Sequence, residues 1–199
     1  MFDLPKSVTI CGKEHPIRYD FRSILDILCA VNDPELTDEE KTVVSLSIFY
    51  PDIERIEDLE EAVKQLLLFI NGGEEDVSRS NDPQLVDWEK DAPRIIPAVN
   101  KVLGYETRAV EYDRENNTGG VHWYTFLGAY MEIGDCLFAQ VVRIRNKIMR
   151  HKKFEKDERE WYRKNRNLVD IKTRLTSDEE RFLESLGLKN PLRKGAGKD

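Results

Sequence analysis

Residues 122–135 read HWYTFLGAYMEIGD, and the spacing of their apolar side chains predicts the fold class. The large apolar positions recur at intervals of i, i+3, i+4, i+7 and i+8, at Trp123, Phe126, Leu127, Tyr130 and Met131. Those intervals place all five side chains on one face of an α-helix, and an apolar stripe of this width needs burial. We therefore interpret the stretch as a packed helix in a mostly α-helical protein.

The same stretch contains residue types that enzymes use, but their spacing argues against a catalytic site. His122 and Glu132 are ten residues apart, which is about 15 Å along a helix axis, so they cannot share a proton on one helix. Asp135 follows Gly134 and is expected to cap the next helix, and Cys136 is expected to be a buried thiol. The chain contains no phosphate-binding loop, zinc-protease or serine-hydrolase signature. We expect no enzymatic activity, no catalytic residues and no cofactor. The alternative to a structural helix in this stretch is a partner-binding face.

The residues before this stretch predict a small N-terminal β-hairpin followed by helices. Alternating apolar residues on either side of Gly12 indicate the hairpin. Asp20 is placed to cap a first helix, and Thr37 forms a capping box with Glu40 for a second helix that Pro51 ends. A third helix is expected to end at Gly72 and Gly73, and to bury Leu59, Ala62, Val63, Leu66, Leu67 and Ile70.

The segment 87–105 is expected to be a helix with two prolines inside it. Its apolar residues have helical spacing, and Pro93 is tolerated if Asp91 caps the start of the helix. Pro97 should then kink the first turns, because proline removes an intrahelical hydrogen bond. After the opening stretch, a further helix is expected over about 135–150.

The chain is long enough for one domain with an appendage. We expect a compact helical domain over 1–150, which includes the hairpin, and a charged helical C-terminal extension over 151–186. The last helix of that extension should start at a capping box formed by Ser177 and Glu180. Residues 187–199 are expected to be a disordered tail.

Composition excludes several classes of protein. The three cysteines are an odd number at wide spacings, which is typical of reduced thiols in a cytoplasm. The three histidines stand at no ligand spacing to a cysteine, so no metal site is expected. The longest apolar run, 66–70, is far shorter than a membrane span, and the first ten residues lack the pattern of a secretory signal.

Charge is distributed unevenly along the chain. Residues 1–142 contain 13 Lys and Arg against 28 Asp and Glu, a net charge of −15. Residues 143–174 contain 13 against 5, a net charge of +8, and the remainder is balanced. An acidic body with a basic arm favours electrostatic association, with a partner or between copies of the chain. A head-to-tail array of copies is our hypothesis for this pattern.

The basic segment 143–166 has two interpretations. Its Lys and Arg residues, with Trp161 and Tyr162 between them, match the composition of a nucleic-acid-binding segment. However, Glu160 and Lys164 stand at i, i+4 with the acid first, so part of the charge is neutralised within a helix. The acidic body would also repel a polyanion. A solvated helix is therefore favoured over a nucleic-acid site.

Six segments, in this order and spacing, resemble the bacteriophage "gene product fifteen" family of long-tailed phages that infect Gram-positive hosts. The resemblance covers roughly residues 4–170 and leaves 175–199 outside the pattern. Pro97 departs from it, since the pattern leads us to expect an uninterrupted helix there. The segments are YDFR (19–22), LTDEEK (36–41), FINGG (69–73), DWEKDAPRIIPAVNKVLG (87–104), HWYTFLGAYMEIGD (122–135) and FAQVVRIRNK (138–147).

The resemblance implies a function in phage tail morphogenesis, because this family is encoded beside the tape measure gene. It implies a non-enzymatic tail assembly chaperone that binds the tape measure protein and helps the tail tube to polymerise, with the major tail tube protein as a further partner. Such a protein would act in the host cytoplasm, form homo-oligomers and be absent from the mature virion. The alternatives are a minor structural protein of the tail and a nucleic-acid-binding regulator that uses 143–166.

Two groups of side chains are candidates for holding a protein partner. Aromatic residues of the opening stretch offer apolar area, and basic residues after it offer charge. The candidates are Trp123, Tyr124, Tyr130, Arg143, Arg145, Lys152 and Lys153. No membrane partner is expected.

Overall fold

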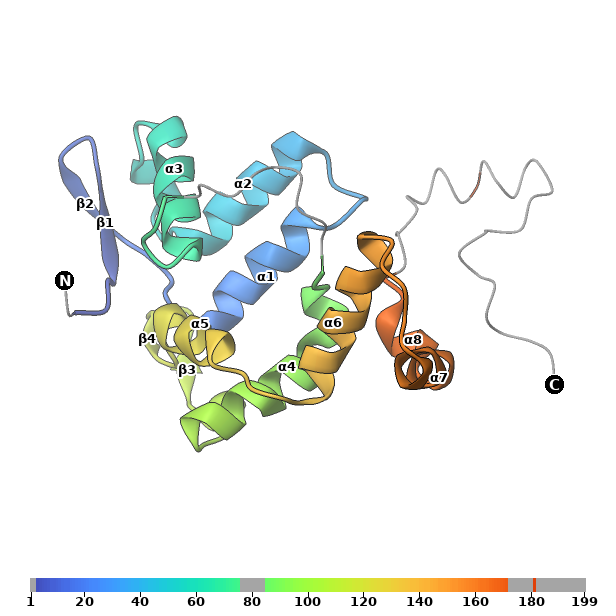
Figure 1. The fold of residues 1–199 in the computed structure, drawn as a ribbon. Helices are drawn as coiled ribbons and strands as arrows, with labels where there is room; N and C mark the ends of the chain where they lie inside the picture. Colours follow the sequence, from blue (N-terminus) through green and yellow to red (C-terminus); the bar gives the residue numbers. More distant parts are fainter. Residues whose placement is uncertain (1–2, 76–84, 172–180, 182–199) are drawn as a thin grey trace.

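Helices make up most of this computed structural model, which describes residues 3–75, 85–171 and Arg181 (Figure 1). The helices are α1 (Phe21–Val31), α2 (Asp38–Phe49), α3 (Leu59–Ile70), α4 (Trp88–Leu103), α5 (Trp123–Met131), α6 (Leu137–Met149), α7 (Lys156–Lys164) and α8 (Arg166–Val169), with 3₁₀ turns η1 (Ile53–Arg55) and η2 (Thr107–Ala109). The strands are β1 (Ser7–Ile10), β2 (Lys13–Pro16), β3 (Tyr112–Asp113) and β4 (Thr118–Gly119). The predicted mostly α-helical class with an N-terminal hairpin is confirmed.

Strands β1 and β2 form the predicted antiparallel hairpin, with Val8 opposite His15. The turn consists of Cys11 and Gly12, which both have positive φ, as a two-residue hairpin turn requires to match the twist of its strands. Ile10 is buried and anchors the hairpin to the core. The predicted position of Gly12 in the turn is therefore confirmed.

Helix α1 lies in the middle of the molecule, and the chain around it is fixed to the start of α5 (Figure 1). Asp20 caps α1 by accepting a hydrogen bond from the Arg22 amide at 3.0 Å. The Phe21 ring stacks on Phe126 of α5 with the ring centroids 4.6 Å apart. The Trp123 amide also donates to a carbonyl just before α1, so two segments a hundred residues apart in the sequence hold each other in place.

Helix α2 packs against α1, and α3 packs against α2 and β1. Thr37 and Glu40 form the capping box of α2. The core side of α3 is made by Ala62, Leu66 and Phe69. Leu67 is exposed, so its predicted burial is wrong, because it lies on the edge of the α3 stripe rather than on the side occupied by those three residues.

Two further core predictions fail at helix ends. Leu59 and Met131 are exposed, Met131 by 71%. Leu59 is the first residue of α3 and Met131 the last residue of α5, so each lacks a neighbouring helical turn on one side. Periodicity alone does not distinguish such terminal positions from interior ones.

Helix α4 starts one turn earlier than the sequence predicted. Asp87, not Asp91, is the N-cap and accepts a hydrogen bond from the Lys90 amide at 2.9 Å. The helix continues through Pro93 and Pro97, whose side chains are exposed. The predicted capping role of Asp91 is therefore wrong, and Asp91 is fully buried inside the helix.

The C-terminal part of the described chain packs against α6 (Figure 1). Helix α6 is capped by the Cys136 thiol, which accepts from the Ala139 amide at 3.4 Å, so the predicted capping by Asp135 is wrong. Cys136 itself is only partly buried. The predicted helix from Ser177 and the predicted tail over 187–199 lie outside the described residues.

Candidate functional site

The opening stretch, now helix α5, is held in the core by its first turn. Trp123 is 1% exposed, and its indole nitrogen donates to the Ile70 carbonyl at the end of α3, at 2.9 Å. Phe126 is fully buried and stacks with Trp123. Burial of two large aromatic rings and one satisfied indole hydrogen bond gives this turn a structural role.

His122 is the N-cap of α5, and both of its ring nitrogens are hydrogen-bonded. The Nδ1 atom accepts from the Tyr124 amide at 3.0 Å, and Nε2 lies 2.8 Å from the Pro5 carbonyl, which can only accept. These contacts require the neutral ring with its proton on Nε2. Burial lowers the pKa of His122, which favours the same neutral form.

The nearest buried carboxylate to this cap is also engaged. Asp20 is fully buried, pairs with the Arg22 guanidinium at 2.7 Å and accepts from the Val121 amide at 2.7 Å. Glu132 and Asp135 are exposed. The titratable groups that the sequence placed in this stretch therefore cap helices or face solvent.

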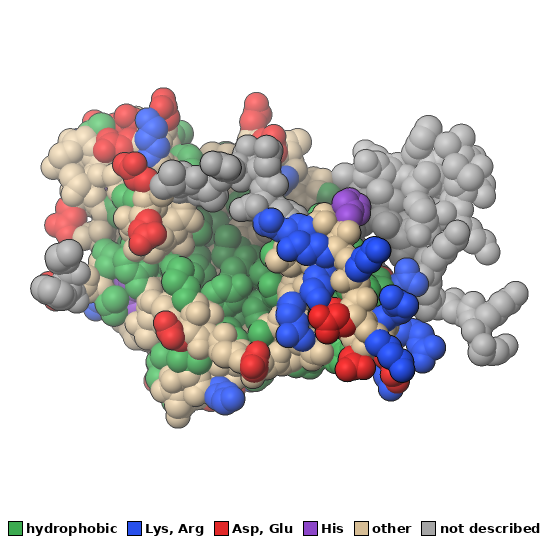
Figure 2. Space-filling model, in the orientation of Figure 1, with side chains coloured by type: hydrophobic (Ala, Val, Ile, Leu, Met, Phe, Trp, Pro, Cys, Tyr) green, Lys and Arg blue, Asp and Glu red, His purple; other side chains and the backbone are tan. Residues whose placement is uncertain are grey.

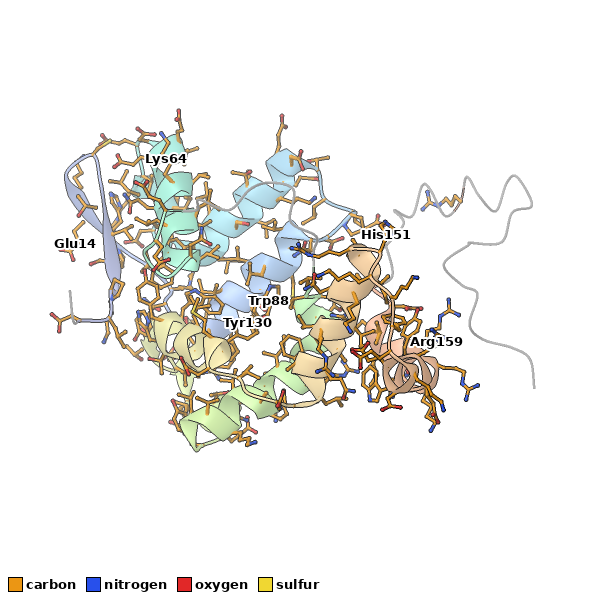
Figure 3. All side chains as sticks on the ribbon, in the orientation of Figure 1. Glu14, Lys64, Trp88, Tyr130, His151 and Arg159 are labelled. Atoms are coloured by element: carbon orange, nitrogen blue, oxygen red, sulfur yellow. The ribbon has the colours of Figure 1, made fainter. Side chains whose placement is uncertain are left out.

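A partly exposed aromatic face remains on the outside of this core. We define the aromatic face as Trp88 of α4 with Tyr124, Leu127 and Tyr130 of α5, all partly buried and packed against the core. The Trp88 and Tyr130 rings are 5.3 Å apart, and both residues lie near the centre of the view in Figure 3. Figure 2 shows hydrophobic side chains gathered there, in a hollow between α3 and α5 on one side and α6 on the other.

Positive charge borders this hollow. Figure 2 shows Lys and Arg side chains along α6 and over α7. We use the name basic border for Arg143 of α6 with Lys152 and Lys153, which follow the end of α6. All three are exposed and form no ion pair with the carboxylates that the structure describes. Lys147, in contrast, pairs with Glu158 at 2.6 Å. An apolar surface near exposed cations suits a partner that is both apolar and acidic.

Arg145 has a different role from its neighbours on α6. It is 3% exposed, and its guanidinium donates to both carboxylate oxygens of Asp91. The same group donates to the carbonyls of Leu85, Leu168 and Val169 at 2.9, 2.8 and 2.7 Å. One side chain thus joins the start of α4, α6 and α8, and its hydrogen-bonding capacity is used inside the protein.

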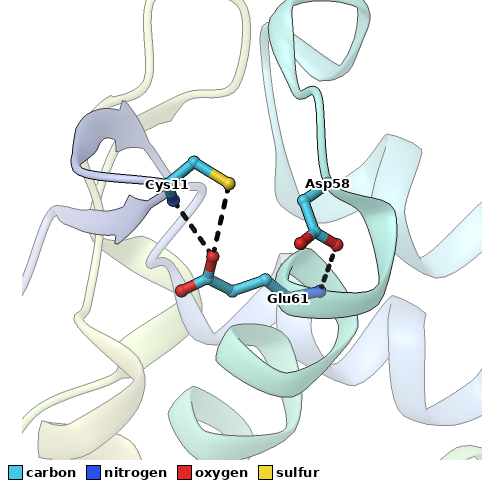
Figure 4. A group of neighbouring side chains, drawn as sticks. All are labelled: Cys11, Asp58 and Glu61. Atoms are coloured by element: carbon cyan, nitrogen blue, oxygen red, sulfur yellow. Dashed lines mark hydrogen bonds between the residues drawn. The ribbon is translucent and has the colours of Figure 1, made fainter.

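A second group of chemically interesting residues joins the hairpin to α3 (Figure 4). Cys11, Asp58 and Glu61 each have a potential metal-ligand atom within 4.8 Å of the others. Asp58 caps α3 through the Glu61 amide at 2.9 Å, and Glu61 accepts from the Cys11 amide at 3.0 Å. Carboxylates are favourable at a helix N-terminus without any cation, so capping and hairpin attachment explain this arrangement.

Comparison with known proteins gives one match. The family model described as "Bacteriophage Gp15 protein" matches residues 1–171. The chain belongs to the bacteriophage Gp15 family. Searches of curated proteins and of solved structures found no match. The family resemblance predicted from the six segments is therefore confirmed, and 172–199 lie beyond the matched residues of this Gp15 family member.

The structure divides the predicted partner-binding residues of this Gp15 family protein into two sets. Trp123 and Arg145 are buried and hold the core together, so they do not offer a surface to a partner in this structure. Tyr124 and Tyr130 are partly exposed on the aromatic face. The remaining candidates, Arg143, Lys152 and Lys153, are exposed and form the basic border.

Two residues of this region were not predicted from the sequence: Trp88 as a partly exposed residue and Asp91 as the partner of Arg145. Trp88 directly follows Asp87, a strong N-cap residue type, and a helix start at Asp87 would have placed Trp88 in the first turn.

No described helix is both long and apolar enough to cross a membrane.

Proposed function

We propose that this Gp15 family protein is a non-enzymatic tail assembly chaperone that binds the tape measure protein in the host cytoplasm. Membership of a bacteriophage family supports a function in phage assembly. The observation that carries the proposal is the aromatic face, where Trp88 and Tyr130 are partly exposed beside the basic border. Aromatic residues with one side packed and one side open are typical of protein interfaces.

The tape measure protein is a suitable partner on physical grounds. It is a very long helical chain whose apolar stripes stay uncovered until tube subunits surround it. Large uncovered apolar surfaces associate indiscriminately. An apolar helix laid into the hollow would be covered by the aromatic face, and acidic residues on that helix would meet the basic border. Many copies of the chaperone would then protect one tape measure chain.

Co-expression with a fragment of the tape measure protein tests the proposal. The wild-type protein should keep the fragment soluble, and Tyr130→Ala should lose most of that effect because it removes the ring in contact with Trp88. Tyr105→Ala is the matched control, since Tyr105 is an exposed tyrosine outside the aromatic face. Circular dichroism must show that both variants are folded. An insoluble fragment with the wild-type protein would refute the function, and equal solubility with Tyr130→Ala would refute the site.

Two further properties belong to the same proposal. A chaperone should be missing from purified virions, whereas a minor structural protein of the tail should appear in their peptide mass spectra. Copies of the chaperone laid side by side should associate through their acidic and basic surfaces. Sedimentation across salt concentrations tests this array, which is wrong if association is absent at low salt or unchanged at high salt.

A further inference from the structure

The chain contains a segment whose chemistry matches the aromatic face and its basic border. Residues 175–188 lie beyond the residues matched by the Gp15 family model. After the predicted N-cap Ser177, the apolar side chains Phe182, Leu183 and Leu186 recur at i, i+1 and i+4. That spacing predicts an amphipathic helix with one apolar stripe.

The remaining side chains of this segment are mostly acidic. Asp178, Glu179, Glu180 and Glu184 outweigh a single arginine. Carboxylates lie beside this stripe and, at Glu179, on the same face one turn before it. An apolar and acidic segment is complementary to a hollow lined by aromatic residues with cations nearby. We propose that residues 175–188 dock on the aromatic face of their own chain and compete there with the tape measure protein.

The continuously described chain ends beside the start of α4, the helix that contributes Trp88 to the aromatic face. The Asp170 carbonyl accepts a hydrogen bond from the Lys90 side chain, and Lys90 is two residues after Trp88 in α4. Tyr162 also fixes Asp170, through a hydrogen bond of 2.8 Å to its carboxylate. The chain therefore leaves Ile171 from an anchored point beside the start of α4.

The connection is long enough for docking within one molecule. Six residues, 172–177, connect Ile171 to the predicted helix, and an extended chain of that length spans up to about 20 Å. A short tether gives an effective concentration on the order of millimolar, which exceeds the concentration of other copies in a dilute solution. These conditions favour the segment of the same chain over that of a second copy.

Acrylamide quenching of tryptophan fluorescence in the full chain tests the docking. A Trp161→Phe background leaves Trp88 as the accessible reporter, because Trp123 is buried. Docking should shield Trp88, and the stripe variant Phe182→Ser with Leu186→Ser should raise the quenching constant. Leu192→Ser, also in the C-terminal part but outside the stripe, is the matched control. Equal quenching in the stripe variant and the control would overturn the proposal.

The dependence on protein concentration identifies the occupant. Shielding within one chain should be unchanged over a hundredfold dilution, whereas shielding that disappears on dilution would replace the own-chain occupant with a second copy. A synthetic peptide of residues 175–188 should restore the shielding of Trp88 in the stripe variant. Failure of this peptide at millimolar concentration would also overturn the proposal. None of these measurements requires the tape measure protein.

The competition itself rests on the proposed function and has a separate readout. If the docked segment occludes the site in about nine of ten molecules, its removal should tighten binding of a tape measure fragment about tenfold. The stripe variant should therefore bind the fragment more tightly than the Leu192→Ser control. Equal affinities together with a change in quenching would keep the docking and exclude the competition. Absence of fragment binding by every variant would refute the proposed function and leave the docking result intact.

Discussion

Replacement of Arg145 by methionine is the sharpest test of how this fold is held together. Arg145 joins α4, α6 and α8 through a buried ion pair with Asp91 and three bonds to backbone carbonyls. Methionine has a similar length and is apolar, so Arg145→Met removes the charge and all the donors while it keeps most of the volume. The change leaves the Asp91 carboxylate fully buried without its main cation.

The expected cost follows from that stranded carboxylate. Breaking a buried ion pair by removing one partner typically costs about 3–5 kcal/mol. The total free energy of unfolding of a domain is about 5–15 kcal/mol, so Arg145→Met should remove a large part of it. Arg94, whose guanidinium is 3.6 Å from Asp91, compensates in part for the lost cation. We therefore expect a cost near the lower end of about 3–5 kcal/mol.

Urea unfolding followed by circular dichroism measures this cost. Arg143→Met is the matched control, because Arg143 is exposed on the same helix and its replacement should change stability by less than about 0.5 kcal/mol. The double variant Asp91→Leu with Arg145→Met removes both charges and should be more stable than Arg145→Met alone. A loss below about 1 kcal/mol for Arg145→Met, or a double variant no more stable than the single one, would refute the reasoning.

Three other predictions concern stability. Because the folded-state pKa of His122 is lowered, only the unfolded chain gains a proton there just below its ordinary pKa of about 6.5. Its contribution to stability should be complete above that pH and fall below it, and urea titrations of His122→Asn from pH 5 to 8 should lack this component. Gly120→Ala should destabilise far more than Gly104→Ala in thermal melts. Both glycines have positive φ, but a Cβ at Gly120 would clash with the buried Asp20 carboxylate, whereas a Cβ at Gly104 would meet open space. Similar losses of stability for both variants would show that the clash at Gly120 is relieved at little cost in free energy. Thr37→Ala should cost about 1 kcal/mol because it removes the α2 cap, and an unchanged unfolding midpoint would contradict that cap.

Local signals in the sequence were sufficient for most helices and the hairpin. Asp20, Thr37 and Gly12 stand where short-range chemistry alone requires them, at two caps and a turn. The burial of Trp123 and Phe126 also agrees with the predicted α5 stripe, although Trp123 is the first residue of that helix. These predictions depend on residues at most a few positions apart, which a sequence displays directly.

Long-range pairing was the part that periodicity did not supply. Asp91 and Arg145 are 54 positions apart, and nothing in the local pattern marks either as buried. Treated separately, an aspartate two residues before a proline is a plausible cap, and an arginine in a basic segment is a plausible surface residue. Their mutual neutralisation makes burial of both acceptable, so their roles follow only from the packing of α4 on α6.

The buried pair also has a consequence for the aromatic face. Arg145 fixes Val169 and Leu168, and Lys90 fixes the next residue, Asp170, beside the start of α4. The position from which the acidic C-terminal segment departs is therefore determined by a charge inside the core. If the segment docks as proposed, Arg145→Met should weaken the shielding of Trp88 even where the protein remains folded, because the tether would lose its anchored origin. If folded Arg145→Met shows the same quenching of Trp88 as the wild-type protein, the contacts of Arg145 in the core do not control the docking of the segment.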